Sequence, residues 1–570
     1  MSFKPSWKLL SLQPALFIIA IGFLITQQKP QPVRAHGSES HQPGLSNSFS
    51  FSTPSNSQDS SLSHRDIDTV QFAPGEEQAM YDRMKQKGIG ILSDDSWELA
   101  QTPLAGTEHI VGKWEGPYDW PVIAIHATLM PNGRVLAYDS VGDNPTESYT
   151  NHTFTRATVW NPSTNSHSRA DVNTGYNIFC SSLTVLLDGR VFAAGGNKNS
   201  NLDGIDKTHF FNPSSQTWSR GPNMLQGDRW YPSVTALSNG DSLISGGGPT
   251  IPEIFQRNGS FRSLPGANAQ IASDRTYHWL KQAPNGQIAY LGPDPTLYYL
   301  NTNGNGNWFN FRTRDQINRS YGSHAMYAPG RALVSGGGNF NSSAVTIDLN
   351  NGTVNNTRSM TYQRLQHNLT VLPNGRVLAT GGMQNTSQGL VDVNKGVFAA
   401  EWWNPNNGRW TTLASMRVTR QYHSIALLLP DGRVLSAGGG ICGACQQQGY
   451  IAKNAEIFSP PDLFRNDGTG RLAPRPSINS ASSSLTYGQT FNISTPQASD
   501  ISRVTLVRFG GVTHSVNMDQ QFVSLSFNRG SGTLQVTAPN NNRTVPPGNY
   551  MLFILNSDGV PSVAKILTLS

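Results

Sequence analysis

Short apolar runs alternate with turns along most of this 570-residue chain. Seven segments share one plan: an apolar run, a Pro-Gly, Asn-Gly or Asp-Gly turn, and a second apolar run that often stops at Gly-Gly, as in SSLTVLLDGRVFAAGG and ALLLPDGRVLSAGGG. This pattern predicts seven β-hairpins. The turn glycines, spaced 44 to 57 residues apart, are Gly133, Gly189, Gly240, Gly286, Gly330, Gly375 and Gly432.

A second kind of segment recurs between the hairpins. ATVWNPSTNSH, HFFNPSSQTW and AEWWNPNNGRW have the composition of outer strands. Four strands over about fifty residues is the period of a kelch-type blade. We therefore expect a seven-bladed kelch-type β-propeller over residues 106–473. Its innermost strands would line a central channel, and the loops at their ends would converge on the axis.

The pattern changes near Pro474. Alternating strands with polar turns over residues 474–570 predict an immunoglobulin-like β-sandwich, although the Cys-Trp-Cys core of antibody domains is missing. Its segment GGVTHSVN predicts a hairpin tip that carries His514. A histidine at such a tip is by default a solvated residue. The fold class is all-β.

Composition agrees with this fold and narrows the function. Glycine (55 residues) and proline (35) are abundant and only 14% of residues are charged, which favours short strands over helices. The net charge of +6 is small, no Lys/Arg cluster stands out, and we expect no nucleic-acid partner. Paired carboxylates at the strand ends, which a hydrolase or lyase would need, are not evident.

The N-terminus resembles an export signal. Lys4 and Lys8 precede an apolar stretch, and Val33-Arg34-Ala35 has the small residues of a cleavage site. We expect a signal peptide over residues 1–35, an uncleaved anchor being the alternative although the apolar core is shorter than the ~20 residues of a spanning helix. Residues 36–105 predict a disordered linker or pro-segment with a short helix. The mature protein would then be secreted, or held in a periplasm or at the cell surface, as a monomer with no membrane contact.

The three cysteines and two tyrosines suggest a site. Cys442 and Cys445 are most simply a local disulfide in an exported chain, because the βαβ setting of a redox motif is missing. Cys180 remains, either as a buried inert thiol or as a functional group. It opens the inner strand of the second blade, and Tyr231 opens that of the third. Tyr422 and His423 stand at the same place in the seventh blade, where the strand begins and neighbouring side chains can still serve one site.

Four segments resemble one family in the same order: FCSSLTVLLDGRVFAAGG, RWYPS, YHSIALLLPDGRVLSAGGGICGAC and FGGVTHSVNMD. They are similar to the copper radical oxidases, the family of galactose oxidase and glyoxal oxidase, and the resemblance covers both expected domains. It implies that Tyr231 is a copper ligand joined to Cys180 by a thioether, and that Tyr422 is the axial tyrosinate. His423 and His514 would be the imidazole ligands, which reverses the local interpretation of His514. Two imidazoles with oxygen ligands suit copper(II).

The resemblance also implies a reaction. Small aldehydes or primary alcohols would be oxidised, with reduction of dioxygen to hydrogen peroxide. Tyr422 would act as general base, and a radical on the Cys180–Tyr231 pair would take a hydrogen from carbon. No organic cofactor is expected, since no strand-linked GxGxxG or Walker motif is present. The alternative is a non-catalytic extracellular propeller that binds carbohydrate or cell wall.

Two departures from galactose oxidase affect the substrate. The chain is too short and too polar before the propeller for the extra carbohydrate-binding domain of that enzyme. Where galactose oxidase has a tryptophan that stacks over its cross-linked tyrosine, this chain reads ISGGGPTIPEIF. The domain organisation is more similar to that of glyoxal oxidase, so small aldehydes or simple primary alcohols are expected as substrates rather than galactose. Trp230, beside Tyr231, either lines the site or packs within its blade.

Overall fold

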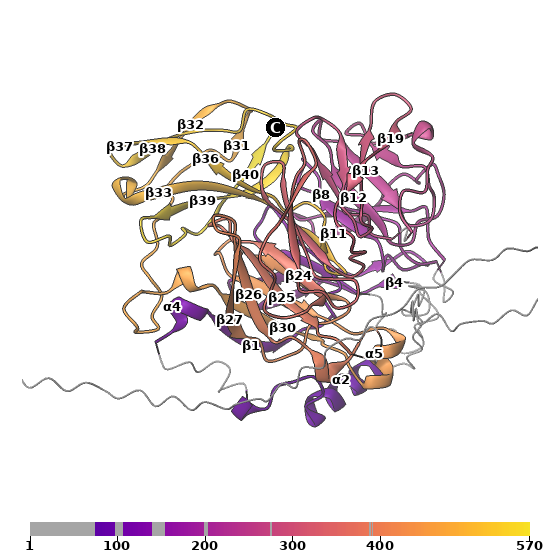
Figure 1. The fold of residues 1–570 in the computed structure, drawn as a ribbon, viewed down its shortest axis with the longest axis horizontal. Coiled ribbons are helices and arrows are strands. Elements are labelled where there is room, and N and C mark those ends of the chain that lie inside the picture. Colours follow the sequence, from indigo (N-terminus) through magenta and orange to yellow (C-terminus); the bar gives the residue numbers. More distant parts are fainter. Residues whose placement is uncertain are drawn as a thin grey trace, which may run out of the picture. The chain divides into compact units, whose positions relative to one another are not determined.

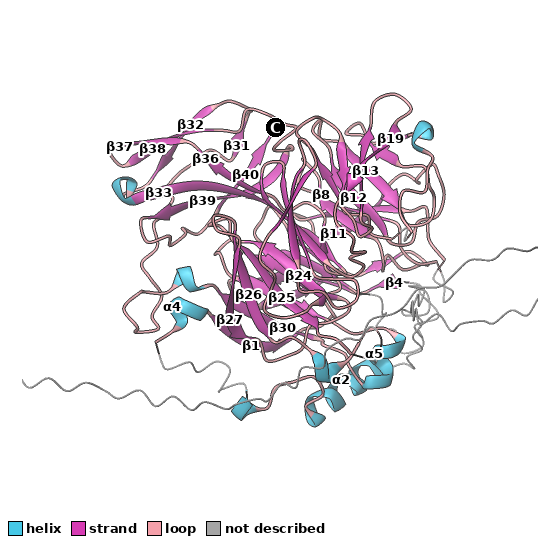
Figure 2. Ribbon diagram, in the orientation of Figure 1, coloured by secondary structure: helices cyan, strands magenta, loops and turns pink. Residues whose placement is uncertain are grey.

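The structure is a computed structural model that describes residues 75–96, 106–139, 154–198, 203–273, 276–386, 389 and 391–570. The expected signal peptide and most of the expected linker lie outside these residues. Among the residues described, no helix is both long enough and apolar enough to cross a membrane. Strands in many small sheets dominate (Figure 2), and the helices are short.

Seven sheets form the propeller (Figure 1), and in each the first two strands are one of the predicted hairpins. The inner hairpins are β2 (His126–Leu129) with β3 (Val135–Tyr138), β8 (Ser182–Val185) with β9 (Val191–Ala194), β12 (Pro232–Ala236) with β13 (Ser242–Gly246), β16 (Leu280–Gln282) with β17 (Ile288–Tyr290), β20 (Ser323–Ala328) with β21 (Arg331–Ser335), β24 (Leu365–Val371) with β25 (Val377–Met383), and β28 (Ser424–Leu428) with β29 (Val434–Gly438). The fold prediction is confirmed.

The outer half of each blade comes from the second kind of segment. These pairs are β5 (Ala157–Asn161) with β6 (Ser166–Arg169), β10 (Thr208–Asn212) with β11 (Thr217–Arg220), β14 (Glu253–Phe255) with β15 (Phe261–Ser263), β18 (Thr296–Asn301) with β19 (Asn307–Thr313), β22 (Ala344–Asp348) with β23 (Thr353–Asn356), β26 (Ala399–Asn404) with β27 (Arg409–Ser415), and β30 (Asn454–Ser459) with β1 (Lys113–Asp119). A small two-stranded sheet is formed by β4 (Phe154–Thr155), which precedes β5 in the sequence, and β7 (Val172–Asn173), which follows β6.

The last blade takes its outer strand from the start of the propeller sequence. Strand β1 pairs antiparallel with β30, from Lys113 opposite Ser459 to Asp119 opposite Asn454. This strand was not predicted, because its sequence KWEGPYD stands ahead of the first repeat. This pairing joins the two ends of the repeat region in one sheet and closes the ring.

Helices occupy the loops and the segment before the propeller. They are α2 (Glu76–Lys87), α4 (Glu108–Val111), α5 (Gly443–Gln448) and the short 3₁₀ turns η1 (Pro265–Ala267), η2 (Val393–Lys395), η3 (Pro461–Leu463) and η4 (Ala498–Asp500). Helix α2 buries Tyr81 and Met84, and its Glu77 forms an ion pair with buried Arg156, which also pairs with Asp139. These contacts fix α2 against the propeller.

The C-terminal domain is a two-sheet sandwich with its own apolar core. One sheet has the strand order β31, β40, β39, β33, β36 and the other β32, β38, β37. Their bounds are β31 (Ser484–Leu485), β32 (Thr490–Ser494), β33 (Ile501–Arg508), β36 (Phe522–Leu525), β37 (Phe527–Gly530), β38 (Thr533–Thr537), β39 (Gly548–Asn556) and β40 (Lys565–Leu569).

A hairpin leaves this sandwich and joins the first blade. It consists of β34 (Gly511–Thr513) and β35 (Val516–Asn517). Strand β34 pairs with the inner strand β2, so the sheet order becomes β35, β34, β2, β3, β5, β6. The hairpin thus lies against the innermost strand, on the side of the propeller axis.

Other blades hold the same hairpin. In the fourth blade, Lys281 Nζ donates to the carbonyl oxygens of Asn517, at 2.8 Å, and Met518. In the fifth blade, Ser323 Oγ donates to the carbonyl of Ser515 at 2.9 Å. Hydrogen bonds from several blades therefore fix the position of the hairpin tip.

Lys281 makes the hairpin sensitive to pH. Its complete burial lowers the pKa from 10.5 to about 7, an effect that Arg508 reinforces and Asp519 opposes. Between pH 7 and 10.5 the unfolded chain holds this proton and the folded chain does not, so the folded state gains stability as the pH rises. We predict that the difference in unfolding free energy between wild type and Lys281→Met rises from pH 7 to 10 by up to about 1.4 kcal/mol per pH unit.

Denaturant unfolding across this pH range measures the effect. Lys565→Met removes an exposed lysine from β40 and controls for the loss of one positive charge. A wild-type minus Lys281→Met difference that stays constant from pH 7 to 10 would contradict the prediction.

Candidate metal centre

Six of the seven inner strands have a residue in the left-handed region near their start. Non-glycine residues rarely adopt a positive φ, and such residues cluster at functional sites. Each of the six stands nine residues before the turn glycine of its hairpin. They are Cys180 (φ 61°), Tyr231 (62°), Tyr277 (36°), Tyr321 (57°), Gln366 (63°) and His423 (67°).

Buried arginines support these strand starts. Arg229, Arg319, Arg364 and Arg420 each precede the left-handed residue by two or three positions. Each donates from Nη1 to the carbonyl of a glycine near the end of the blade's second strand, at 2.6 to 3.1 Å. All but Arg319 also pair with a buried glutamate of the third strand, and Arg319 pairs with Asp315.

Four side chains meet at the axis. The hydroxyl oxygens of Tyr231 and Tyr422 are 3.0 Å apart, and His514 Nε2 lies 2.9 Å from the Tyr231 hydroxyl. The His423 ring centroid is 4.0 Å from that of Tyr422 and 4.3 Å from that of His514. The structure thus brings together two residues of the seventh blade, one of the third, and the tip of the C-terminal hairpin.

Hydrogen bonds orient both imidazoles. His423 Nδ1 lies 2.7 Å from the carbonyl oxygen of Gly440 and donates to it, so the lone pair is on Nε2. His514 Nδ1 lies 2.6 Å from Thr513 Oγ1. In metal sites the second ring nitrogen of a histidine ligand is usually held in this way, which fixes the ring.

The donor set fits copper. Two imidazoles and two phenol oxygens suit copper(II), whereas structural zinc prefers a closed set of cysteine and histidine. No group of three or more His, Cys, Asp or Glu that could hold a metal occurs in the described part of the chain. A metal at the axis would therefore need the tyrosine oxygens.

Two aromatic rings enclose Tyr231. Trp230 stacks on one side with ring centroids 4.1 Å apart and planes 14° apart, and Tyr277 stacks at 4.6 Å and 28°. Trp230 is buried and packs directly against the Tyr231 ring. A tryptophan thus covers the ring although none follows the Gly-Gly of the third blade.

Cys180 lies in the same buried cluster as Tyr231. Its carbonyl accepts the Tyr231 N–H at 3.0 Å, so the starts of the second and third blades are joined directly. The other two cysteines form the predicted disulfide, Cys442–Cys445.

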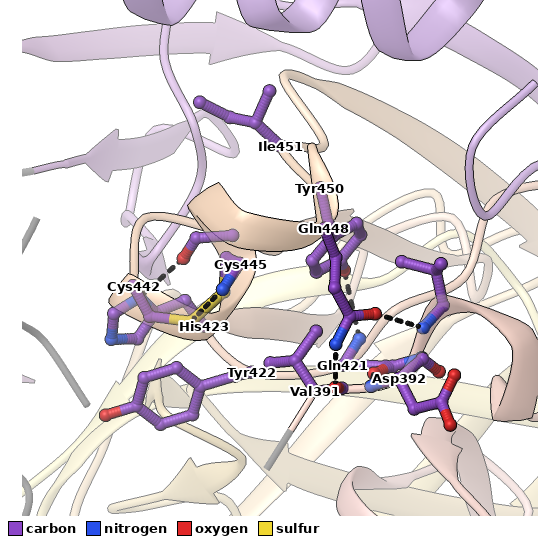
Figure 3. Close-up of a disulfide and its surroundings, with 12 residues drawn as sticks. Val391, Asp392, Gln421, Tyr422, His423, Cys442, Cys445, Gln448, Tyr450 and Ile451 are labelled. Carbon is purple, nitrogen blue, oxygen red and sulfur yellow. Dashed lines mark hydrogen bonds between the residues drawn. A yellow bond between two sulfur atoms is a disulfide. The ribbon is translucent and has the colours of Figure 1, made fainter. Parts of the chain in front are cut away.

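The disulfide loop packs on the site. Figure 3 shows Tyr422 and His423 beside the loop that carries Cys442 and Cys445. Gly440, just before this loop, accepts from His423 Nδ1 and donates its N–H to the Tyr422 carbonyl at 3.0 Å. The disulfide therefore constrains a loop that holds two of the four axial residues.

A small pocket with a cavity volume of about 40 Å³ opens beside Tyr422 and His514. Its lining contains no charged residue among those described, and its walls are mainly aromatic. The sequence analysis missed its principal wall residues, Tyr277, Trp279 and Tyr321. Their signal was present, because Tyr277 and Tyr321 keep the nine-residue spacing to the turn glycine that Tyr231 has.

Comparison with known proteins agrees with the fold. Residues 346–459 match the family model "Glyoxal oxidase N-terminus" and residues 475–569 match "Galactose oxidase-like, Early set domain". Galactose oxidase of Gibberella zeae is 31% identical over 527 residues, which cover 84% of this chain and 72% of the relative. Aldehyde oxidase GLOX of Vitis pseudoreticulata is 28% identical over 443 residues, with 68% and 81% coverage.

A solved structure gives the same result. A fungal alcohol oxidase in complex with copper matches with a TM-score of 0.73 at 27% identity, over 81% of this chain and all of the other. Fold and donor set together define a copper-dependent oxidase on a β-propeller. The chain belongs to the copper radical oxidase family, to which the galactose oxidases belong, and the resemblance noted in the sequence is confirmed.

Proposed function

We propose that this copper oxidase oxidises small aldehydes or primary alcohols and reduces dioxygen to hydrogen peroxide. The observation that carries the proposal is the meeting of two phenols and two imidazoles beside a pocket whose described lining residues carry no charge. A binding module would have no need for this buried set of four.

The four axial residues would hold the metal. Tyr231, Tyr422, His423 and His514 supply two oxygen and two nitrogen donors, and bound copper would supply one-electron redox chemistry. Tyr422, which lines the pocket, would accept the proton of the substrate hydroxyl as general base. Tyr231 would take the hydrogen from the substrate carbon.

We propose a thioether between Cys180 and Tyr231 as the second redox group. Cys180 is buried, stands outside the disulfide and is hydrogen-bonded through its backbone to Tyr231. Trp230 and Tyr277 both stack on the tyrosine ring and would shield a radical there from solvent.

The pocket favours small uncharged substrates. A sugar is usually bound by several directed polar or charged groups, because a buried hydroxyl without a partner is unfavourable. The pocket offers Thr276, Ser320 and tyrosine hydroxyls among aromatic walls. This composition supports simple aldehydes and alcohols over galactose.

Export also belongs to the proposal. The Cys442–Cys445 disulfide is typical of an oxidising compartment, which agrees with the expected signal peptide.

The first test is activity. Copper-loaded protein that has been treated with a one-electron oxidant should produce peroxide from small aldehydes or primary alcohols. The kcat/KM for these substrates should be at least about tenfold above that for galactose, because one galactose hydroxyl left without a hydrogen-bond partner in the pocket would cost about that factor. Tyr422→Phe should lower kcat/KM by at least about 100-fold through loss of the general base. Tyr298→Phe, on the outer strand β18, is the control. Silence across both substrate classes would leave the binding module as the function.

The second test is metal binding. His514→Ala should lower the affinity for copper at least about tenfold, because it removes a metal ligand. Removing only a residue that hydrogen-bonds to a ligand already lowers metal affinity by about this factor. The propeller should stay folded, because the hairpin comes from the other domain. His209→Ala, which removes a buried histidine from β10, is the matched control in a copper titration. Equal affinity of wild type and His514→Ala would exclude His514 as a ligand.

The third test is the cross-link. A digest of copper-matured protein should contain a reduction-resistant peptide pair that joins Cys180 to Tyr231 and lacks two hydrogens relative to its parts. The pair should be absent in Cys180→Ser and present in Tyr298→Phe, the control variant on the outer strand β18. A Cys180 thiol that remains fully alkylatable after copper treatment in air would rule out the cofactor.

A further inference from the structure

We propose that His126 and Tyr138 of the first blade are positioning residues that hold Cys180 for its bond to Tyr231. This inference rests on the proposed thioether and concerns how the chain prepares it. The first blade has Ala124 at the position where the other six have a left-handed residue, and it contributes these two side chains to the second blade instead.

His126 binds the backbone of Cys180. Its Nε2 accepts the Cys180 N–H at 3.1 Å, while the Cys180 carbonyl accepts the Tyr231 N–H at 3.0 Å. Both backbone polar groups of Cys180 are therefore fixed, one by each neighbouring blade. The φ of 61° is unfavourable for a cysteine and persists only where the surroundings impose it.

Tyr138 extends this support to the next residue. Its ring is stacked on His126, with centroids 4.4 Å and planes 8° apart, and its hydroxyl lies 2.8 Å from Ser181 Oγ. The Ser181 carbonyl accepts the hydroxyl of Tyr277 at 3.1 Å, the same tyrosine that stacks on Tyr231. The dipeptide Cys180–Ser181 is thus held from the first, third and fourth blades at once.

This support matters for the bond-forming step. A bond forms between Cys180 Sγ and a ring carbon of Tyr231, and the S–H and ring C–H bonds break. Two protons and two electrons leave, and dioxygen takes them up as hydrogen peroxide. A reaction of this kind is fast only when the two groups are held in the reactive orientation. Without the His126 bond, Cys180 can relax to an ordinary φ that turns its side chain away.

Three variants test the proposal. His126→Phe keeps a ring over Tyr138 but has no acceptor for the Cys180 N–H, and His126→Gln keeps an acceptor but no ring. Tyr138→Phe keeps the stack and loses the contact with Ser181. Full-length chains are purified without copper, given copper in air, and followed by intact mass for the loss of two hydrogens.

His126→Phe should form the cross-link about tenfold more slowly than wild type, as the loss of one buried hydrogen bond predicts. His126→Gln should restore most of the rate, and Tyr138→Phe should slow it about threefold to tenfold. Copper affinity and melting temperature, measured on the same preparations, separate positioning from general destabilisation. Should His126→Phe not fold, Tyr138→Phe and His126→Gln carry the comparison.

Wild-type rates in both His126→Phe and Tyr138→Phe would overturn the inference while leaving the thioether intact. A slower rate that only mirrors weaker copper binding would overturn it as well. Absence of any cross-link in wild type would instead refute the proposed cofactor, and the inference with it.

Discussion

The structure depends on buried arginines at the starts of its inner strands. A guanidinium without water needs partners on all sides, and here a glycine carbonyl of the second strand and a carboxylate of the same blade supply them. The arginine therefore ties three segments of one blade together at the end that faces the site. In these four blades the left-handed residue follows the arginine by two or three positions, whereas Cys180 has the same backbone conformation without an arginine at that distance. Arg229 and Arg420 thus fix the ends of the blades from which Tyr231 and His423 reach the axis.

The second constraint is the hairpin from the C-terminal domain. By pairing with β2 it continues the first blade beyond its inner edge, and polar groups of other blades bind its tip. The pairing fixes the register, so His514 can reach Tyr231 only in one alignment of β34 on β2. A site assembled in this way needs both domains, since the propeller alone holds three of the four axial side chains.

Much of this could be predicted from the sequence, and the exceptions have physical reasons. The seven hairpins were predictable because each turn requires a residue such as Gly133 or Gly432, and the Cys442–Cys445 disulfide because its loop is short. The closing strand β1 could not be predicted, since a strand that pairs with one some 340 residues later has no local repeat to mark it. The pairing of the hairpin with the first blade was hidden for the same reason. The stacking of Trp230 on Tyr231 depends on side-chain packing, which the spacing of residues does not reveal. The positions of Tyr277 and Tyr321 near the site could have been predicted, because each stands nine residues before the turn glycine of its hairpin. The ligand roles themselves stay predictions.

The repeat also separates stability from chemistry. Hairpin turns recur in all seven blades and the buried arginine in four of them, and both belong to the scaffold of the blade. The residue nine positions before the turn glycine varies freely: cysteine, three tyrosines, glutamine and histidine in blades two to seven. Since every one of these positions has the same left-handed backbone, a change of side chain there alters what the axis can bind without altering how the blade folds. The first blade is the exception. It has Ala124 at this position and contributes no side chain to the axis there, while its His126 accepts a hydrogen bond from the backbone of Cys180 in the neighbouring blade.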